Sequence, residues 1–281
     1  MFTLLISAEQ LSSQLSSHHK PIIFDCRFDL QNLKAGYETY NSAHIPTAFY
    51  LDLEQDLSGT KTGLNGRHPL PEQTTLAEKL RAYGVSDTSQ IIAYDAQGGI
   101  FAARLWWLLR WLGHENIAVL DGGIQAWTAA GYCLTQEVMR PQPGNFSIRP
   151  ALQSSVPVSE VINNLKNKTD LVIDARSPDR FRGENETLDP VGGHIPHAIN
   201  HFFKNNLQEN GHFKSTEDLK KDWLPLLGNR TADQTIHQCG SGVTACHNLL
   251  ALEVAGLKGA KLYAGSWSEW CSDASRPLAV G

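Results

Sequence analysis

The chain repeats itself, and this feature constrains its fold more than any other. The first half contains "IIFDCRFD", then "SAHIPTAF", then "IAYDAQGGIFAARLWWLLRWLG", and the second half contains "LVIDARSPDRF", "GGHIPHAIN" and "IHQCGSGVTACHNLLALEVAG" in the same order. The matched pairs are Asp25 with Asp174, His44 with His194, Gly113 with Gly256 and Trp127 with Trp270. An ordered series of this kind predicts a tandem duplication of a unit of about 120 to 130 residues, the usual size of one domain.

Each repeat predicts an α/β domain. Short apolar runs such as "PIIFD" and "LVID" are typical of buried strands, and they alternate with helical patterns such as "TTLAEKLRAYG". This alternation predicts a mostly parallel sheet flanked by helices, in which sites form where strands end. We expect a first domain over 1–140, a proline-containing linker over 141–155 and a second domain over 156–281.

Composition excludes several classes of function. The 281 residues carry a formal net charge of −5, and no dense run of Lys and Arg indicates a nucleic-acid partner. No apolar stretch approaches the length of a membrane span, so no membrane partner is expected either. The five cysteines are scattered without a CxxC pair. Together with the absence of a dinucleotide fingerprint, this predicts a cytoplasmic protein with no metal ion and no organic cofactor. We expect a monomer, although no residue pattern specifies the oligomeric state.

Cys239 stands at the position where an α/β site would form. It follows the predicted strand "QTIHQ" and precedes the glycine-rich run "GSGVT" and a helical pattern that stops before Gly256. Glycines let the backbone curl, and the N–H groups at a helix N-terminus favour negative charge. Such a loop stabilises a thiolate, or an anion carried on its sulfur. Cys239 is therefore the candidate nucleophile.

The loop has two alternative interpretations. A lone cysteine is commonly an inert buried residue, which is how we interpret the other four cysteines. A cysteine-dependent phosphatase would need an arginine six positions after the thiol to bind phosphate oxygens, and Ala245 stands there. The absence of charge in the loop therefore disfavours phosphate cleavage.

The first repeat provides an internal comparison. Asp95 in "YDAQGG" is the counterpart of Cys239, and the glycine pair is kept. Because a carboxylate cannot carry sulfur, only the second repeat can use this chemistry. The first repeat is expected to be a degenerate structural partner.

The motifs "CGSGVTACHNLLALE", "DARSPDRFRGE", "GGHIPHA" and "GSWSEWCSDASRP" resemble those of the two-domain sulfurtransferases, the rhodanese and 3-mercaptopyruvate sulfurtransferase family. The resemblance covers nearly the whole chain. It implies two tandem rhodanese-like domains and a ping-pong reaction, in which a cysteine persulfide carries sulfur from a small donor to a thiol or cyanide acceptor. Cys239 would carry the sulfur, and the backbone amides from Gly240 to Thr244, those of Gly240, Gly242, Val243 and Thr244 with that of Ser241, would hold the charge.

The resemblance also implies a donor. The loop Cys-Gly-Ser-Gly-Val-Thr is similar to that of the mercaptopyruvate branch, whereas the thiosulfate branch has basic residues in it. Ser241 would handle protons together with His68 and the acid Glu54. For His68, a histidine in a surface loop is the alternative.

Arg180 matches the first arginine that would hold the donor's carboxylate, and an exposed ion-paired arginine is the alternative. Leu188 and Asp189 stand where the second family arginine is expected, with Arg182 or Arg67 as possible replacements.

Three functions remain open. The first is transfer from 3-mercaptopyruvate, and the second is transfer from thiosulfate to cyanide. The third is a non-catalytic persulfide carrier or redox-sensing module. Asp174, Arg176 and His194 recur in the half without the thiol as Asp25, Arg27 and His44, so these residues are expected to maintain the fold.

Overall fold

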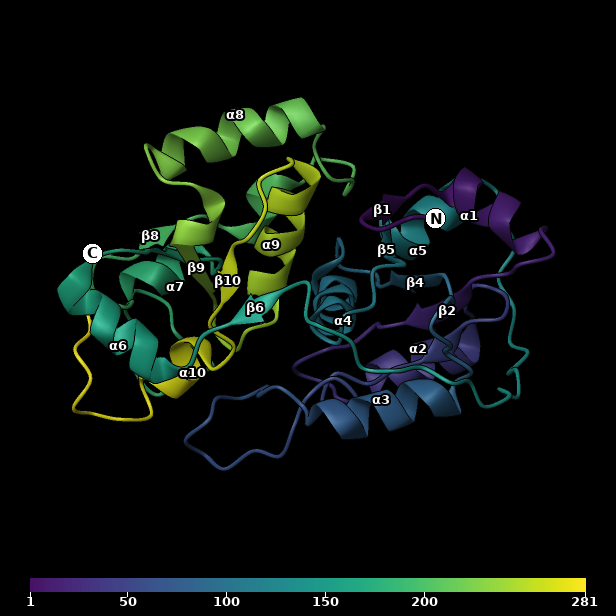
Figure 1. Ribbon diagram of the computed structural model, residues 1–281, viewed down its shortest axis with the longest axis horizontal. Coiled ribbons are helices and arrows are strands. Elements are labelled where there is room, and N and C mark those ends of the chain that lie inside the picture. The colour runs from purple at the N-terminus through teal and green to yellow at the C-terminus, as the bar shows by residue number, and fades with distance from the viewer. The chain divides into compact units, whose positions relative to one another are not determined.

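The computed structural model describes residues 1–281 (Figure 1). The elements of the first half are β1 (Leu5–Ile6), α1 (Ala8–Leu15), β2 (Ile22–Asp25), α2 (Ala35–Ser42), β3 (Phe49–Tyr50), α3 (Gln73–Ala82), β4 (Ile91–Tyr94), α4 (Ile100–Trp111), β5 (Ile117–Leu120) and α5 (Gly123–Ala129). Those of the second half are β6 (Ser154–Ser155), α6 (Val158–Asn167), β7 (Leu171–Asp174), α7 (Pro178–Arg182), β8 (Ile199–Asn200), the 3₁₀ helix η1 (Phe203–Asn206), α8 (Thr216–Leu227), the 3₁₀ helix η2 (Ala232–Gln234), β9 (Thr235–Gln238), α9 (Thr244–Val254), β10 (Lys261–Leu262) and α10 (Ser266–Trp270).

The chain divides into two compact units. The first unit comprises Met1–Gly59, Pro71–Leu152 and Glu209–Phe213, and the second comprises Thr60–Leu70, Gln153–Gln208 and Lys214–Gly281. This division differs from the expected boundaries, because two segments group with the unit of the other half. The expected linker over 141–155 also differs: most of it belongs to the first unit, where Phe146 is buried and its N–H donates to Val85 O at 3.1 Å.

The two sheets share one topology. Each has five parallel strands, in the orders β1-β5-β4-β2-β3 and β6-β10-β9-β7-β8. Asp25 pairs with Tyr94 in the first sheet, and Asp174 pairs with Gln238 in the second. The residues that follow Tyr94 and Gln238 are Asp95 and Cys239, so the predicted repeat register is the structural register.

Local sequence explains how each strand is followed by a helix. Ser7 caps α1, where its side chain accepts the N–H of Gln10 at 3.2 Å and completes a capping box. The helix α4 is buried along nearly its whole length, as its continuous apolar pattern predicts. Within the first unit, Figure 1 shows α1 and α5 beside each other and the strands between them and α2 with α3.

The paired Asp, Arg and His residues make equivalent contacts in both units. Arg27 donates to the buried Asp25 and to Ala43 O, and Arg176 donates to the buried Asp174 and to Gly193 O. His44 bridges to Thr135, and His194 bridges to Ala279. These contacts tie the end of a central strand to the chain around it, which supports the structural role expected for the six residues.

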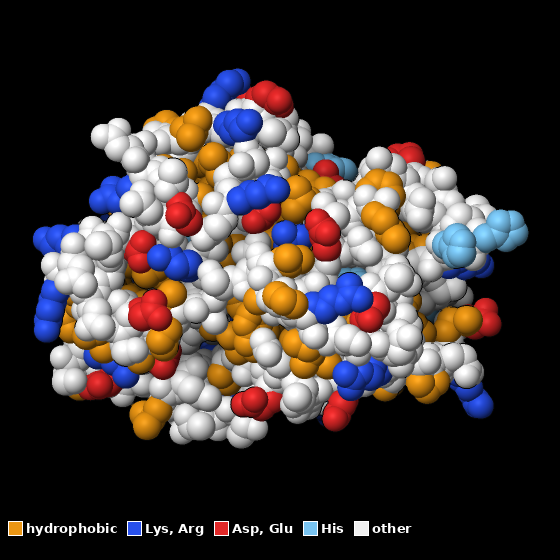
Figure 2. Space-filling model, in the orientation of Figure 1, with side chains coloured by type: hydrophobic (Ala, Val, Ile, Leu, Met, Phe, Trp, Pro, Cys, Tyr) orange, Lys and Arg blue, Asp and Glu red, His pale blue; other side chains and the backbone are white.

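None of the helices is long and apolar enough to cross a bilayer. On the face drawn in Figure 2, basic and acidic side chains are interspersed rather than gathered by sign.

Replacing Asp25 by Asn should lower the free energy of unfolding by about 3 to 5 kcal/mol, because it leaves the buried Arg27 guanidinium without its counter-charge. Urea unfolding followed by circular dichroism measures this. Asp29→Asn is the control, since Asp29 is exposed, and it should change stability by no more than about 0.5 kcal/mol. Equal stability of the two variants would show that the buried pair does not hold the strand end.

Candidate active site

Cys239 is fixed at the start of the loop between β9 and α9. Its N–H donates to Ser266 Oγ at 3.1 Å, and its carbonyl oxygen accepts the N–H of Trp267 at 3.0 Å. Only 2% of the residue is exposed. The first residues of α10 therefore hold the cysteine backbone from both sides, which leaves little freedom in where its sulfur points.

Ser266 is a residue of the site that the sequence interpretation missed. Its φ of 55° lies in the left-handed region, where glycine is favoured. Its counterpart in the first repeat is Gly123, with a φ of 60°. The second repeat thus has a strained serine backbone where the first has glycine. The Ser266 hydroxyl oxygen accepts a hydrogen bond from the Cys239 N–H. Comparing "GGIQAW" with "GSWSEW" could have revealed this exchange.

The glycines of the loop have different requirements. Gly242 has a φ of 75°, and a Cβ on it would run into the carbonyl oxygen of Ala264. A Cβ on Gly240 would instead lie 2.8 Å from Arg67 Nη2 and 3.5 Å from Arg180 Nη2. Gly242 is needed for the turn itself, whereas Gly240 keeps space beside two guanidinium groups.

The equivalent loop of the first unit binds an anion that the chain itself supplies. The buried Asp95 carboxylate accepts the N–H groups of Gln97 at 2.8 Å and Gly99 at 2.9 Å through Oδ1. Through Oδ2 it accepts those of Phe101 at 2.8 Å and Ala102 at 3.0 Å. Burial raises the pKa of Asp95, and these four donors oppose that shift. The loop geometry therefore directs four N–H groups at one carboxylate.

His68 and Ser241 meet in the second unit although they are far apart in sequence. His68 Nδ1 is hydrogen-bonded to Ser241 Oγ at 2.7 Å, and the residues are 2% and 7% exposed. The alternative of a surface-loop histidine is therefore wrong. The connection arises because Thr60–Leu70 packs within the second unit, where Arg67 N–H also donates to Ser268 Oγ at 3.0 Å.

Arg67 and Arg180 are the two arginines beside the cysteine loop, as the contacts of Gly240 show. Arg180 forms a two-pronged ion pair with Glu186, at 3.0 and 2.8 Å, and its side chain keeps 18% exposure. Arg67 pairs with Asp189. Arg182 lies apart from this group, exposed and paired with Glu184. Of the two replacements considered for the second arginine, Arg67 lies at the loop and Arg182 does not.

Leu188 and Asp189, which stand where the second arginine was expected, lie in different environments. Leu188 is 43% exposed. The Asp189 side chain is 2% exposed and contacts both Arg67 and Arg180. Burial raises the pKa of Asp189, although Arg67 opposes this. Burial also acts to raise the pKa of Glu186, but hydrogen bonds from Arg180 and from the Leu188 N–H outweigh it, and the pKa is lowered.

Val243 and Thr244 occupy the N-terminus of α9, where Val243 is the N-cap residue. Glu54 belongs to the first unit, where its N–H donates to Asp52 Oδ1 at 2.8 Å, and its role in the reaction stays a prediction. No group of three or more His, Cys, Asp and Glu side chains in the chain is arranged to hold a metal ion.

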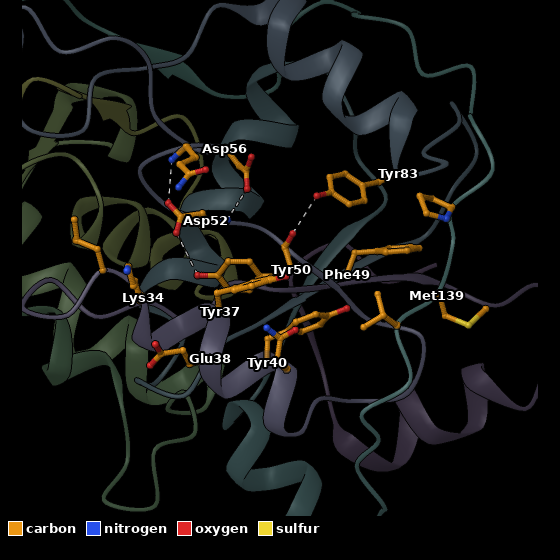
Figure 3. A pocket seen from close by; sticks show the side chains of 15 residues that line it. Lys34, Tyr37, Glu38, Tyr40, Phe49, Tyr50, Asp52, Asp56, Tyr83 and Met139 are labelled. Atoms are coloured by element: carbon orange, nitrogen blue, oxygen red, sulfur yellow. Dashed lines mark hydrogen bonds between the residues drawn. The ribbon is translucent and has the colours of Figure 1, made fainter.

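A cavity of about 630 Å³ lies in the first unit (Figure 3). None of the predicted site residues lines it. Several of its polar groups are already engaged: Tyr50 Oη donates to Asp52 at 3.3 Å, Tyr83 Oη donates to the Tyr50 carbonyl, and Asp56 pairs with Lys79. The chemistry of the cysteine therefore has to be sought at the loop rather than in this cavity.

Gly242→Ala should mainly affect stability, whereas Gly240→Ala should mainly affect turnover. Gly242→Ala should lower the unfolding free energy by about 1 to 3 kcal/mol, because its Cβ meets backbone in a left-handed conformation. Gly240→Ala should leave stability within about 1 kcal/mol but slow turnover about tenfold or more, because Arg67 must move. Thermal unfolding and steady-state kinetics measure these effects. The reverse pattern would contradict the assigned roles.

Known proteins provide an independent comparison. A family model described as "Rhodanese-like domain" matches residues 7–130 and 157–273. A Pseudomonas aeruginosa protein named "Probable 3-mercaptopyruvate sulfurtransferase" is 45% identical over 279 residues, covering 99% of this chain and 98% of that protein. A Mycobacterium tuberculosis protein named "Putative thiosulfate sulfurtransferase SseB" is 34% identical, covering 99% and 97%.

A solved structure agrees with these matches. The crystal structure of SseA from Escherichia coli, described as a 3-mercaptopyruvate sulfotransferase, superposes with a TM-score of 0.82 at 31% identity and covers 95% of this chain and 99% of its own. The family match extends over both halves, and the two units share one sheet topology. The chain therefore belongs to the rhodanese family, with one rhodanese-like domain in each half.

Proposed function

We propose that the protein is a sulfurtransferase that carries sulfur as a persulfide on Cys239, with 3-mercaptopyruvate as its donor. The observation that carries this proposal is the environment of Asp95 in the first unit. In the equivalent loop its carboxylate sits on four backbone N–H groups, so the loop is built to bind a negative charge at that position. In the second unit the same position holds a sulfur atom, and the charge would be that of a thiolate or persulfide.

The pattern of donors around Asp95 refines the predicted cradle. Counted along the repeat, the amides of Gln97, Gly99 and Phe101 correspond to those of Ser241, Val243 and Ala245. We assign the stabilisation of the sulfur anion mainly to these three N–H groups. Gly240 and Gly242 then determine the shape of the loop, and Thr244 is the first residue of α9.

The reaction proceeds in two transfers. The Cys239 thiolate attacks the sulfur of mercaptopyruvate, the carbon–sulfur bond breaks, and the electron pair leaves on carbon as the enolate of pyruvate. Protonation of that carbon releases pyruvate, and the cysteine holds a persulfide. An acceptor thiolate or cyanide then attacks the outer sulfur, the sulfur–sulfur bond breaks, and the Cys239 thiolate is restored. Splitting one transfer into two steps is the advantage of a covalent intermediate.

The His68–Ser241 hydrogen bond supports a role in moving the required proton. Its length of 2.7 Å and its burial orient the serine hydroxyl beside the loop. In this proposal the pair protonates the enolate carbon as pyruvate leaves, with Glu54 as a further acid.

Arg180 and Arg67 support a donor that carries a carboxylate. A planar guanidinium forms directional hydrogen bonds to carboxylate oxygens, and both groups lie beside Gly240. Thiosulfate is the second candidate donor. Its support is that relatives named as thiosulfate sulfurtransferases match the chain.

A non-catalytic persulfide carrier is a different class of function. It would accept sulfur on Cys239 but would not turn over with small acceptors. We also propose that the protein works as a monomer in a reducing cytoplasm, which is supported by five cysteines that are all free thiols.

Incubation with mercaptopyruvate should add one sulfur atom to the wild-type protein and none to Cys239→Ser, because only Cys239 occupies the anion-binding loop. Intact mass spectrometry measures this. The same mass gain on Cys239→Ser would place the persulfide elsewhere. Release of the sulfur to cyanide or a small thiol with multiple turnovers excludes the carrier function, and its absence would support it.

Replacing Arg180 by Ala should raise KM for mercaptopyruvate about tenfold or more, because a charge-assisted hydrogen bond to the donor is lost. Arg182→Ala is the matched control, since this arginine is two positions away, exposed and paired with Glu184. It should leave KM unchanged. If both variants had the same KM as the wild type, Arg180 would not contact the donor.

A further inference from the structure

Asp189 lies between the two arginines that we assign to the donor. Its Oδ1 pairs with Arg67 Nη1, and its Oδ2 lies 3.4 Å from Arg180 Nη2. The side chain is only 2% exposed. A carboxylate of the chain thus makes the contacts that a donor's carboxylate would make with the same two guanidinium groups.

The charged side chains around this position are balanced. Three arginines, Arg67, Arg176 and Arg180, face three carboxylates, Asp174, Glu186 and Asp189, and every cation has an anionic partner. An approaching anion therefore finds positive groups that are already neutralised. Removing the Asp189 charge would leave one positive charge in excess beside Gly240.

The segment that carries Asp189 is held in place at several points. Glu186 Oε1 accepts the N–H groups of Leu188 and Asp189 at 2.9 and 3.1 Å, and Trp267 Nε1 donates to Val191 O at 2.8 Å. Two glycines with positive φ, Gly183 and Gly193, flank the segment, and it contains no helix or strand. The carboxylate is thus presented by an irregular segment between two glycines.

We propose that Asp189 is a built-in occupant of the donor-carboxylate position and determines which anions reach Cys239. A donor must displace Asp189 from Arg67 and Arg180, so anions that bind these groups weakly are rejected. This inference rests on the proposed function, because it concerns the donor position of that site. It assigns a role in specificity to the residue that replaces the expected second arginine.

An ordinary structural ion pair is the competing explanation. In that case Asp189 orients the two arginines, and removing its charge would weaken the recognition of a carboxylate. The two explanations therefore predict changes of opposite sign when the carboxylate is replaced by an amide of the same shape.

Alkylation of Cys239 by two reagents tests this without any sulfur donor. Iodoacetate carries a carboxylate and iodoacetamide does not, so the ratio of their rates on Cys239 reports the recognition of a carboxylate beside the thiol. We expect Asp189→Asn to raise the ratio of the iodoacetate rate to the iodoacetamide rate about tenfold. A change of this size corresponds to one charge-assisted hydrogen bond. Cys239→Ser provides the background rate.

Three further variants make the test specific. Asp189→Ser should raise the ratio as Asp189→Asn does, which covers a failure of the amide variant to fold. Adding Arg180→Ala to Asp189→Asn should remove the increase. Glu184→Gln, which neutralises an exposed carboxylate paired with Arg182, should leave the ratio at the wild-type value. An unchanged or lowered ratio in Asp189→Asn, or the same increase in Glu184→Gln, would overturn the proposal.

The outcome is independent of the donor assigned above. If mercaptopyruvate adds no sulfur but the ratio rises, the proposed donor fails and the role of Asp189 stands. If mercaptopyruvate adds sulfur but the ratio does not rise, the proposed function stands and Asp189 is a structural ion pair.

Discussion

The proposed chemistry depends on one interaction, which is the binding of a negative charge by backbone N–H groups where a strand ends and a helix begins. In the first unit the charge is the buried carboxylate of Asp95, held by four such groups. The loop, its glycines and the helix N-terminus together form one anion-binding site. The second unit has a loop of equal length at the same place, where Cys239 stands, although Gly99 has a φ of 92° and its counterpart Val243 a φ of −92°. We propose that this loop stabilises charge on sulfur.

Much of this arrangement could be predicted because it is encoded locally. The repeat aligned Asp95 with Cys239, and the strand register confirms that alignment. The meeting of His68 with Ser241 joins residues 173 positions apart and depends on the packing of Thr60–Leu70 in the second unit, which no local pattern reveals. The ion pairs of Asp189 are likewise a matter of side-chain packing. Ser266 could have been found from its repeat partner, Gly123.

Electrostatics divides the site into two parts. The thiol loop itself holds no charged side chain. The charge stabilisation that we propose there comes from backbone dipoles, which cannot be titrated. The donor side holds paired arginines and carboxylates whose charges cancel. The first part has a counterpart in the first repeat, where the Asp95 carboxylate occupies the loop, and we propose that it supports the chemistry on sulfur. The second part belongs to the second unit and is where we expect donor choice to be decided.

The central claim is that backbone N–H groups of the loop hold the persulfide anion. A crystal structure of the protein after treatment with donor tests it most directly. We predict that the outer sulfur on Cys239 lies within hydrogen-bonding distance of the N–H groups of Ser241, Val243 and Ala245, in the place that the Asp95 carboxylate occupies in the first unit. An outer sulfur turned away from these groups, toward Arg67 and Arg180, would contradict the account.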